Sequence, residues 1–340
     1  MEQTRKTDKG IFFTVRIHSI PADRPLPYDV YLWIDDRPIL FRKRNELIDH
    51  DRMERLKQAG VKDALIPDEQ RQLYIYSLLD MVRHPDLQMD IKARFIKETA
   101  FVHVHDLFTQ QNIATVLSDS KILIEEVVRF IAEDMEAATS LMRLSNHDYY
   151  TYNHSVNVAV YSIALAKKII GDDKLVLVAA GFGGLLHDIG KRKVGLNILN
   201  KEGPLEKEEW RIMKKHPDYG LEFLRSYVHV PQEAREIVGQ HHENFDGTGY
   251  PVGLKEEEIS KLARICAIAD VFDALTTTRS YREAMPATEA LETMFSMQPG
   301  KFDPAIFRHF NKELDTKGRL SLEDDFDPCD HHHSKKIKKA

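Results

Sequence analysis

The hydrophobic pattern of this 340-residue chain changes near Leu79, and this change most constrains the fold. Before Leu79, several short segments alternate apolar and polar residues as β-strands do. After it, apolar residues recur at helical spacing as far as about Leu314. The pattern predicts a mainly α fold in which a helical bundle follows a small α/β N-terminal domain. We expect an N-terminal module at 1–80, a helical connector at 81–117, a helical domain at 118–316 and a charged, disordered tail at 317–340.

The N-terminal module mixes the two kinds of pattern. Its sequence contains no recognisable nucleophile, phosphate-binding loop or metal cluster. We therefore interpret it as a sensory or docking module that can bind a protein partner. Alternation predicts strands at 11–18, 28–34, 38–41 and 61–66, and helical spacing predicts helices at 52–59 and 68–79.

The helical region is predicted from apolar stripes and from residues that begin or end helices. Ser118 or Ser120 is expected to cap a long helix whose apolar positions follow a 3.6-residue period. Turn residues such as Gly203 and Pro204 separate the later helices. These helices are predicted at 156–170, 174–186, 206–215, 232–240, 259–276, 287–297 and 304–314.

Composition excludes several classes of protein. The chain has only two cysteines, which excludes a disulfide scaffold and a zinc finger. Its net charge of -6 argues against a broad electrostatic grip on nucleic acid, so we expect no DNA partner. We find no signal peptide and no apolar segment of ~20 residues, and therefore expect a cytoplasmic protein without a membrane span. The 16 histidines leave open a metal site with nitrogen and oxygen ligands.

One His-Asp pair stands in a context that suits metal chemistry. His187 and Asp188 end an apolar segment and are followed by Gly190 and Lys191. Glycine at this point frees the backbone to turn, which would bring the imidazole, the carboxylate and the lysine close together. The two oxygens of one carboxylate can bridge neighbouring metal ions.

Further candidate ligands recur near the ends of predicted helices. His154 opens one helix, His216 closes another, and His241 and His242 close a third. Asp270 lies inside an apolar helix, where an unpaired charge is costly and a cation would stabilise it. Each histidine alone is more simply a core or surface residue. Together, these residues have the composition of a two-metal site.

These residues stand in motifs that resemble the HD-GYP family of cyclic di-GMP phosphodiesterases, a branch of the HD superfamily of metal-dependent phosphohydrolases. The most specific motifs are HDIGK at 187–191 and HHENFDGTGYP at 241–251. The resemblance covers about residues 118–314 and implies an HD-superfamily helical bundle with a metal centre. Further segments that agree with the family lie at 152–159, 198–205, 213–217 and 269–282.

The resemblance also assigns metal ligands and implies two divalent cations, with iron or manganese expected. Asp188 would bridge the two cations. Some family members hold a third metal with a glutamate four residues before the first histidine ligand. That position here is Tyr150, so we expect two metals. The implied ligands are His154, His187, Asp188, His216, His241, His242 and Asp270.

The same resemblance implies how cyclic di-GMP is held and cleaved. A water or hydroxide between two cations has a lowered pKa and would attack phosphorus, with Asp188 setting its basicity as the bridging ligand. Lys191 would stabilise the negative charge that develops on a phosphate oxygen. Hydrolysis would give pGpG and, after a second cut, GMP. Substrate contacts are also implied for Gly249, Tyr250, Pro251, Arg279 and Arg282, and Ser280 departs from the family's usual proline.

Two alternative functions remain compatible with the sequence. One is a catalytically weak receptor that binds the cyclic dinucleotide and signals through a protein partner. The other is a phosphodiesterase for a different cyclic dinucleotide. No implied ligand is missing from the chain, which favours an active enzyme. The connector helices could mediate a homodimer, and the ligands do not distinguish iron from manganese because both accept them.

Overall fold

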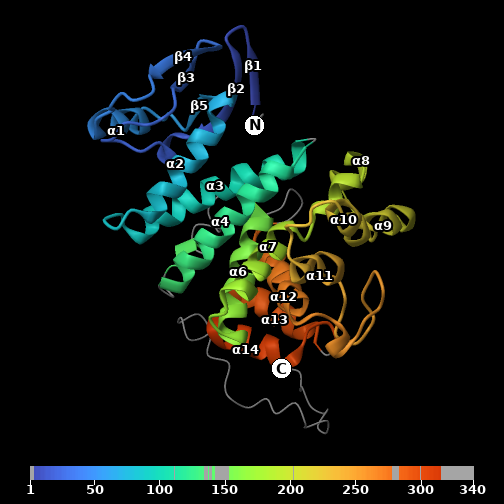
Figure 1. Cartoon of the computed structure of the whole chain (residues 1–340). Helices are drawn as coiled ribbons and strands as arrows, with labels where there is room; N and C mark the ends of the chain where they lie inside the picture. The colour runs from blue at the N-terminus through green and yellow to red at the C-terminus, as the bar shows by residue number, and fades with distance from the viewer. Residues whose placement is uncertain are drawn as a thin grey trace, which may run out of the picture.

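The computed structural model describes residues 4–110, 112–133, 153–201, 203–277, 283–298 and 300–314, and positions 137, 140 and 141. A small sheet domain lies at one end of the molecule, and helices fill the rest (Figure 1). Helices α3 (Met89–Thr109) and α4 (Ala114–Glu133) lie between the sheet domain and the other helices (Figure 1). The prediction of a mainly α fold behind a small mixed domain is confirmed.

The N-terminal sheet has five strands in the order β1-β2-β5-β3-β4, and its strand pairs are antiparallel. The predicted strands are all present. The additional strand, β1, is short and polar, so no apolar alternation reveals it. The strands are β1 (Thr4–Thr7), β2 (Gly10–Arg16), β3 (Val30–Ile34), β4 (Arg37–Arg42) and β5 (Asp63–Pro67).

Helix α2 (Arg71–Arg83) supplies a buried aromatic residue to the core of the sheet domain. The ring of Tyr74 makes edge contacts with Phe13, at 5.6 Å between centroids, and with Tyr28, at 5.4 Å. Its hydroxyl lies 2.7 Å from Ser19 Oγ, so this buried polar group has a hydrogen-bond partner. The domain also contains η1 (Ile17–Ser19), α1 (His50–Gln58) and η2 (Asp68–Gln70).

The helical region contains the elements that apolar periodicity predicts. Helices α7 (Lys174–Leu186), α11 (Gln232–Gln240) and α14 (Pro304–Leu314) have the predicted bounds. None of the described helices has both the length and the apolar character needed to cross a membrane. The other elements are α6 (Asn153–Ile170), η3 (Ile189–Lys193), α8 (Leu196–Leu199), α9 (Lys207–Met213), α10 (His216–Leu224), η4 (Glu256–Glu258), α12 (Lys261–Thr276) and α13 (Ala287–Ser296).

The predicted serine cap of the long helix α4 is wrong. The helix begins at Ala114, so Ser118 and Ser120 lie inside it. Ser120 Oγ donates a hydrogen bond to the Val116 carbonyl oxygen at 2.7 Å, which satisfies the hydroxyl within the helix. Asn112 Oδ1 instead accepts a hydrogen bond from the Ala114 backbone N–H at 3.1 Å.

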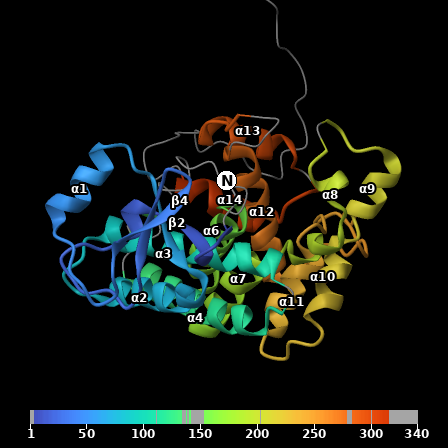
Figure 2. The same cartoon turned by 90° about the horizontal axis from the view of Figure 1, so that it is seen from above.

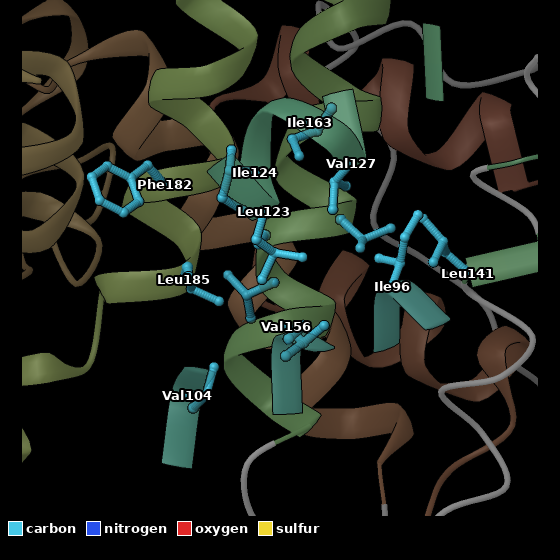
Figure 3. Close-up of a cluster of buried hydrophobic side chains, with 14 of the residues drawn as sticks. Ile96, Val104, Leu123, Ile124, Val127, Leu141, Val156, Ile163, Phe182 and Leu185 are labelled. Carbon is cyan, nitrogen blue, oxygen red and sulfur yellow. The ribbon is translucent and has the colours of Figure 1, made fainter. Parts of the chain in front are cut away.

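Helix α7 is buried, and its glycines let neighbouring helices approach closely. A Cβ added at Gly184 would lie 2.8 Å from Ala159 Cα on α6. A Cβ added at Gly183 would lie 2.3 Å from Ile237 Cδ1 on α11. This packing holds the C-terminal end of α7 in the middle of the helical domain. Helices α4, α6 and α7 contribute to a cluster of buried apolar side chains that includes Leu123, Ile124, Ile163, Phe182 and Leu185 (Figure 3).

Candidate metal centre

The predicted metal ligands come from separate helices that meet at the C-terminal end of α7. Helices α10 and α11 lie on the side of the molecule opposite α1 (Figure 2). The helical domain therefore assembles the site from segments far apart in the sequence. The ligands are His154 on α6, His187 and Asp188 after α7, His216 on α10, His241 and His242 after α11, and Asp270 on α12.

His216 begins a helix instead of ending one, which corrects the sequence prediction. Helix α9 ends at Met213, and α10 starts at His216. Pro217 favours this start, because the first residues of a helix need no intrahelical N–H donor. His216 Nδ1 lies 2.9 Å from the Met213 carbonyl oxygen, so the ring hydrogen-bonds back to the end of α9.

The two oxygens of the Asp188 carboxylate face different histidines. Oδ2 lies 3.3 Å from His187 Nε2, whereas Oδ1 lies 3.4 Å from His216 Nε2 and 4.0 Å from His241 Nε2. Asp188 consequently belongs to two groups of candidate ligand atoms, in each of which all atoms lie within 4.8 Å of one another. One group adds His154 and His187, and the other adds His216, His241 and His242. A shared carboxylate is the arrangement of a bridging ligand.

Two candidate ligand atoms at the site lack a hydrogen-bond partner among the described residues. Within the part of the chain that the structure describes, His187 Nε2 and Asp188 Oδ1 are buried without a hydrogen bond. Nδ1 of His187 lies 2.8 Å from the Gly184 carbonyl oxygen, and Nδ1 of His241 lies 3.1 Å from that of Val238. A ring that donates from Nδ1 leaves the lone pair of Nε2 for a metal. The donor set therefore fits divalent cations.

The protonation states of Asp188, His241 and His242 also suit a metal. Burial opposes the ionisation of Asp188, but the nearby Lys191 and His187 lower the pKa of its carboxyl well below the usual range. Burial lowers the pKa of His241 well below its usual value and that of His242 to about 3. Ionised carboxylates and neutral imidazoles are the forms that ligate metals.

His154 lies between two carboxylates of α12. Its Nε2 is 3.1 Å from Asp270 Oδ1, and its Nδ1 is 2.7 Å from Asp273 Oδ2. Burial alone would lower the pKa of His154, but hydrogen bonds to Asp270 and Asp273 raise it to about 9. Asp273 is a partner of this candidate ligand that sequence reasoning missed. Its spacing from Asp270 is the available signal, because residues three apart share one helical face.

Lys191 lies beside the shared carboxylate. Its Nζ donates a hydrogen bond to Asp188 Oδ2 at 2.6 Å, and its side chain is about one-third exposed (31%). The turn η3 begins directly after Asp188, so the backbone brings Lys191 back toward the site. The ammonium group therefore lies at the site, and its contact with a substrate phosphate stays a prediction.

Glu243 organises the loop that carries the predicted substrate contacts, a role that sequence reasoning missed. Its buried carboxylate accepts backbone N–H hydrogen bonds from Val252 at 2.8 Å, Gly253 at 3.0 Å and Leu254 at 3.1 Å. The sequence signal for this role is limited to position: Glu243 directly follows the candidate ligands His241 and His242 and precedes a glycine-rich loop. The bonds close the loop onto the end of α11.

The loop brings Tyr250 next to the metal ligands. The Tyr250 ring lies 4.7 Å from the His242 ring, and the Lys214 ammonium lies 5.2 Å from the Tyr250 centroid. The peptide between Tyr250 and Pro251 is cis. Gly249 permits the close turn, because an added Cβ would lie 2.2 Å from Asn244 N. The structure thus brings Gly249, Tyr250 and Pro251 beside the metal site.

Some predicted residues lie outside the part of the chain that the structure describes. Among them are Arg279 and Arg282, the two basic substrate contacts, and Ser280 between them. Tyr150, which decides the expected number of metals, and the tail at 317–340 also lie outside. The roles expected for these positions stay predictions.

Comparison with known families and relatives identifies the helical region. Residues 135–306 match the model of the HD domain family. The chain is 43% identical over 192 residues to the cyclic di-GMP phosphodiesterase PA4108 of Pseudomonas aeruginosa, covering 56% of this chain and 46% of that protein. It is 42% identical over 167 residues to the 3′3′-cGAMP-specific phosphodiesterase 3 of Vibrio cholerae, covering 48% of this chain and 35% of that protein. The chain therefore spans less than half the length of these two relatives.

A solved structure extends the likeness beyond the HD domain. Bd1817, a HDG"Y"P protein from Bdellovibrio bacteriovorus, is similar with a TM-score of 0.68 and 25% sequence identity. The likeness covers 89% of this chain and 99% of that chain, so it includes much of the N-terminal region. The HD domain match, this structural likeness and the two motifs brought together at one site lead to the same result: the chain belongs to the HD-GYP family of the HD superfamily.

Proposed function

We propose that the protein hydrolyses cyclic di-GMP to pGpG and, by a second cut, to GMP at a two-metal site. The observation that carries this proposal is the Asp188 carboxylate, whose two oxygens belong to two separate groups of ligand atoms. A carboxylate shared in this way suits a pair of cations a few Å apart. The names of relatives such as PA4108 support the substrate class.

The proposed cofactor is a pair of divalent cations, with iron or manganese expected from the nitrogen and oxygen donors. When bound, such a pair activates water and stabilises the attacking and leaving oxygens of a phosphodiester. Asp188 would contribute one carboxylate oxygen to each cation. The other proposed ligands are His154, His187 and Asp270 at one cation, and His216, His241 and His242 at the other.

The chain's own residues would hold and orient the substrate. Lys191 donates to Asp188 Oδ2, and a cation on this oxygen would repel the ammonium. Lys191 is then available to a phosphate oxygen, where it would stabilise developing negative charge. Glu243 holds the loop that presents Tyr250, and Arg279 and Arg282 are the proposed basic contacts further along the chain.

A second candidate substrate is 3′3′-cGAMP. The chain is about as similar to the Vibrio cholerae enzyme named for that substrate as to PA4108. Both cyclic dinucleotides present phosphodiesters and at least one guanine, so the metal site alone does not select between them. A catalytically weak receptor is the remaining alternative.

The test is product analysis with metal-loaded protein. Anaerobically purified protein loaded with Fe²⁺ or Mn²⁺ is incubated with cyclic di-GMP or with 3′3′-cGAMP, and products are separated by chromatography. We expect pGpG from cyclic di-GMP, no product from Asp188→Asn, and unchanged turnover by Asp172→Asn, whose carboxylate is exposed. Tight binding without any product would favour the receptor. Faster cleavage of 3′3′-cGAMP would replace the proposed substrate.

Two further predictions concern partners. The N-terminal module at 1–80 is proposed to bind a signal or a protein partner, and the connector at 81–117 to support a homodimer. The predicted boundaries fall inside α2 and α4, so these helices continue across them. Sedimentation of the full chain would give its oligomeric state.

A further inference from the structure

We propose that Lys97, on helix α3, is a positioning residue for the metal ligand His154 and acts through Asn157 and Asp273. The inference rests on the proposed metal site and extends it to a residue outside the matched HD domain, which begins at residue 135. Three hydrogen bonds connect these four side chains in series. The link joins α3, α6 and α12.

The first step is the clamp on the His154 ring. Asp273, only 1% exposed, lies with Oδ2 2.7 Å from His154 Nδ1. A carboxylate on Nδ1 fixes the orientation of an imidazole and directs Nε2 toward a metal. His154 Nε2 accordingly faces Asp270, another candidate ligand, at 3.1 Å. The position of the Asp273 carboxylate therefore decides the position of this ligand atom.

The second step is the amide that holds Asp273. Asn157 is buried, and its Nδ2 donates a hydrogen bond to Asp273 Oδ1 at 2.6 Å. Thr277 Oγ1 donates to the same oxygen at 3.0 Å. If the Asn157 amide turned over, its oxygen would face the carboxylate and repel it, since neither is a donor. The orientation of this amide therefore matters for the clamp.

The third step is the ammonium that orients the amide. Lys97 Nζ donates a hydrogen bond to Asn157 Oδ1 at 2.7 Å. The lysine ammonium has donors and no acceptor. It can therefore hydrogen-bond to the amide only when the amide oxygen faces α3. Lys97 thereby selects the arrangement in which Asn157 donates to Asp273.

Helix α3 also contacts the N-terminal domain next to Lys97. Glu98 lies 3.5 Å from Arg16 Nε and 3.3 Å from His18 Nε2. Directly after the C-terminal end of α3, the Gln110 carbonyl oxygen accepts a hydrogen bond from Arg192 Nη2 of η3 at 2.7 Å. Lys97 thus lies on a helix that contacts the sheet domain, helix α6 and the turn η3.

The experiment measures metal binding by Lys97→Met and its controls. Metal-free protein is titrated with Mn²⁺ in a calorimeter, and Co²⁺ absorption reports the ligand geometry. We expect one of the two binding steps to weaken about tenfold in Lys97→Met, because outer partners of metal ligands typically change affinity by about 10–100-fold. The other step and the unfolding temperature of the metal-free protein should stay unchanged. Lys97→Arg, which keeps a cationic donor, should restore most of the affinity.

Two comparisons make the result specific. Arg94→Met removes an exposed cation from the same helix and should leave both binding steps unchanged. In an Asn157→Ala background, Lys97→Met should cause no additional loss, because its effect passes through the amide. Equal weakening of both steps, or wild-type binding by Lys97→Met, would overturn the inference. Failure of the wild-type chain to bind metal would instead overturn the proposed function.

Discussion

The backbone of Gly190 lies directly against the carbonyl oxygen of His216. A Cβ added at Gly190 would lie 1.9 Å from that oxygen and 2.5 Å from Gly220 N. The turn η3 therefore packs on α10 without space for any side chain at this position. This contact joins the His187-Asp188 motif to a ligand that comes from a different helix.

Substitution of Gly190 by alanine should separate the two parts of the metal site. The methyl group would push α10 away from η3, at a cost of about 1–3 kcal/mol for overpacking. We expect a lower unfolding temperature and weaker Mn²⁺ binding, measured by thermal denaturation and calorimetry. Gly195→Ala is the matched control, because its Cβ would meet only the flexible end of Asn197. Equal effects of the two variants would contradict the prediction.

Replacement of Glu243 by glutamine should loosen the loop around Tyr250. The glutamine amide keeps one acceptor oxygen. Its NH₂ group cannot accept hydrogen bonds from the backbone N–H groups that now donate to the carboxylate. Hydrogen exchange of the 252–254 amides should become faster, and the KM for cyclic di-GMP should rise more than kcat falls. Metal content should stay the same.

The control for this loop variant is Glu258→Gln. Glu258 accepts one exposed hydrogen bond, from Lys255 N at 3.1 Å, which lies just outside residues 252–254. Its substitution should leave the exchange of these amides unchanged. If the 252–254 amides of Glu243→Gln exchanged their hydrogens at the wild-type rate, the prediction that the carboxylate holds the loop would be contradicted.

Divalent cations should stabilise the folded chain, because the ligands are assembled only in the native state. One site occupied at 100 times its Kd adds about 2.7 kcal/mol to the free energy of unfolding. Chemical denaturation of chelator-treated protein, with and without Mn²⁺, measures this difference. Asp188→Asn should lose most of it. The same stabilisation in that variant would indicate binding elsewhere, for example at the histidines of 331–333.

The ion pair of Arg71 and Asp106 should make stability depend on pH. Burial opposes the ionisation of Asp106, but hydrogen bonds and charge interactions with His105 and Arg71 outweigh burial and lower the pKa of its carboxyl. The folded pKa thus lies below the unfolded value of about 3.9, so the stabilisation is present above that value. It is lost as the pH falls through the lower, folded pKa.

The variant Asp106→Asn tests this dependence. At pH 7 it should lower the free energy of unfolding by about 1–3 kcal/mol, because a buried charged hydrogen bond is lost. The difference from the wild type should shrink as the pH falls below about 3.9, and urea denaturation at several pH values measures it. Asp86→Asn, whose side chain is 88% exposed, should show little difference at any pH. A pH-independent loss in Asp106→Asn would mean that ionisation of this carboxyl contributes nothing.

The sequence by itself determined the local elements of the helical region. Helices α7 and α11 have their predicted bounds because apolar periodicity and helix ends depend on residues a few positions apart. Asp173, for example, caps α7 by accepting a hydrogen bond from Leu175 N at 2.9 Å. The same local reasoning failed at α4, where Ser120 bonds within the helix, and at the polar strand β1.

The candidate metal ligands were also predicted from the sequence, through the motifs at 187–191 and 241–251 and the family-like segments at 152–159, 213–217 and 269–282. How they meet depends on the packing of the whole chain, which sets the histidines that each Asp188 oxygen faces and the carboxylates that contact His154. Asn157 and Asp273 are 116 positions apart, and Lys97 and Asn157 are 60 apart. Contacts over such separations come from the packing of whole helices, and no local pattern of residues encodes them.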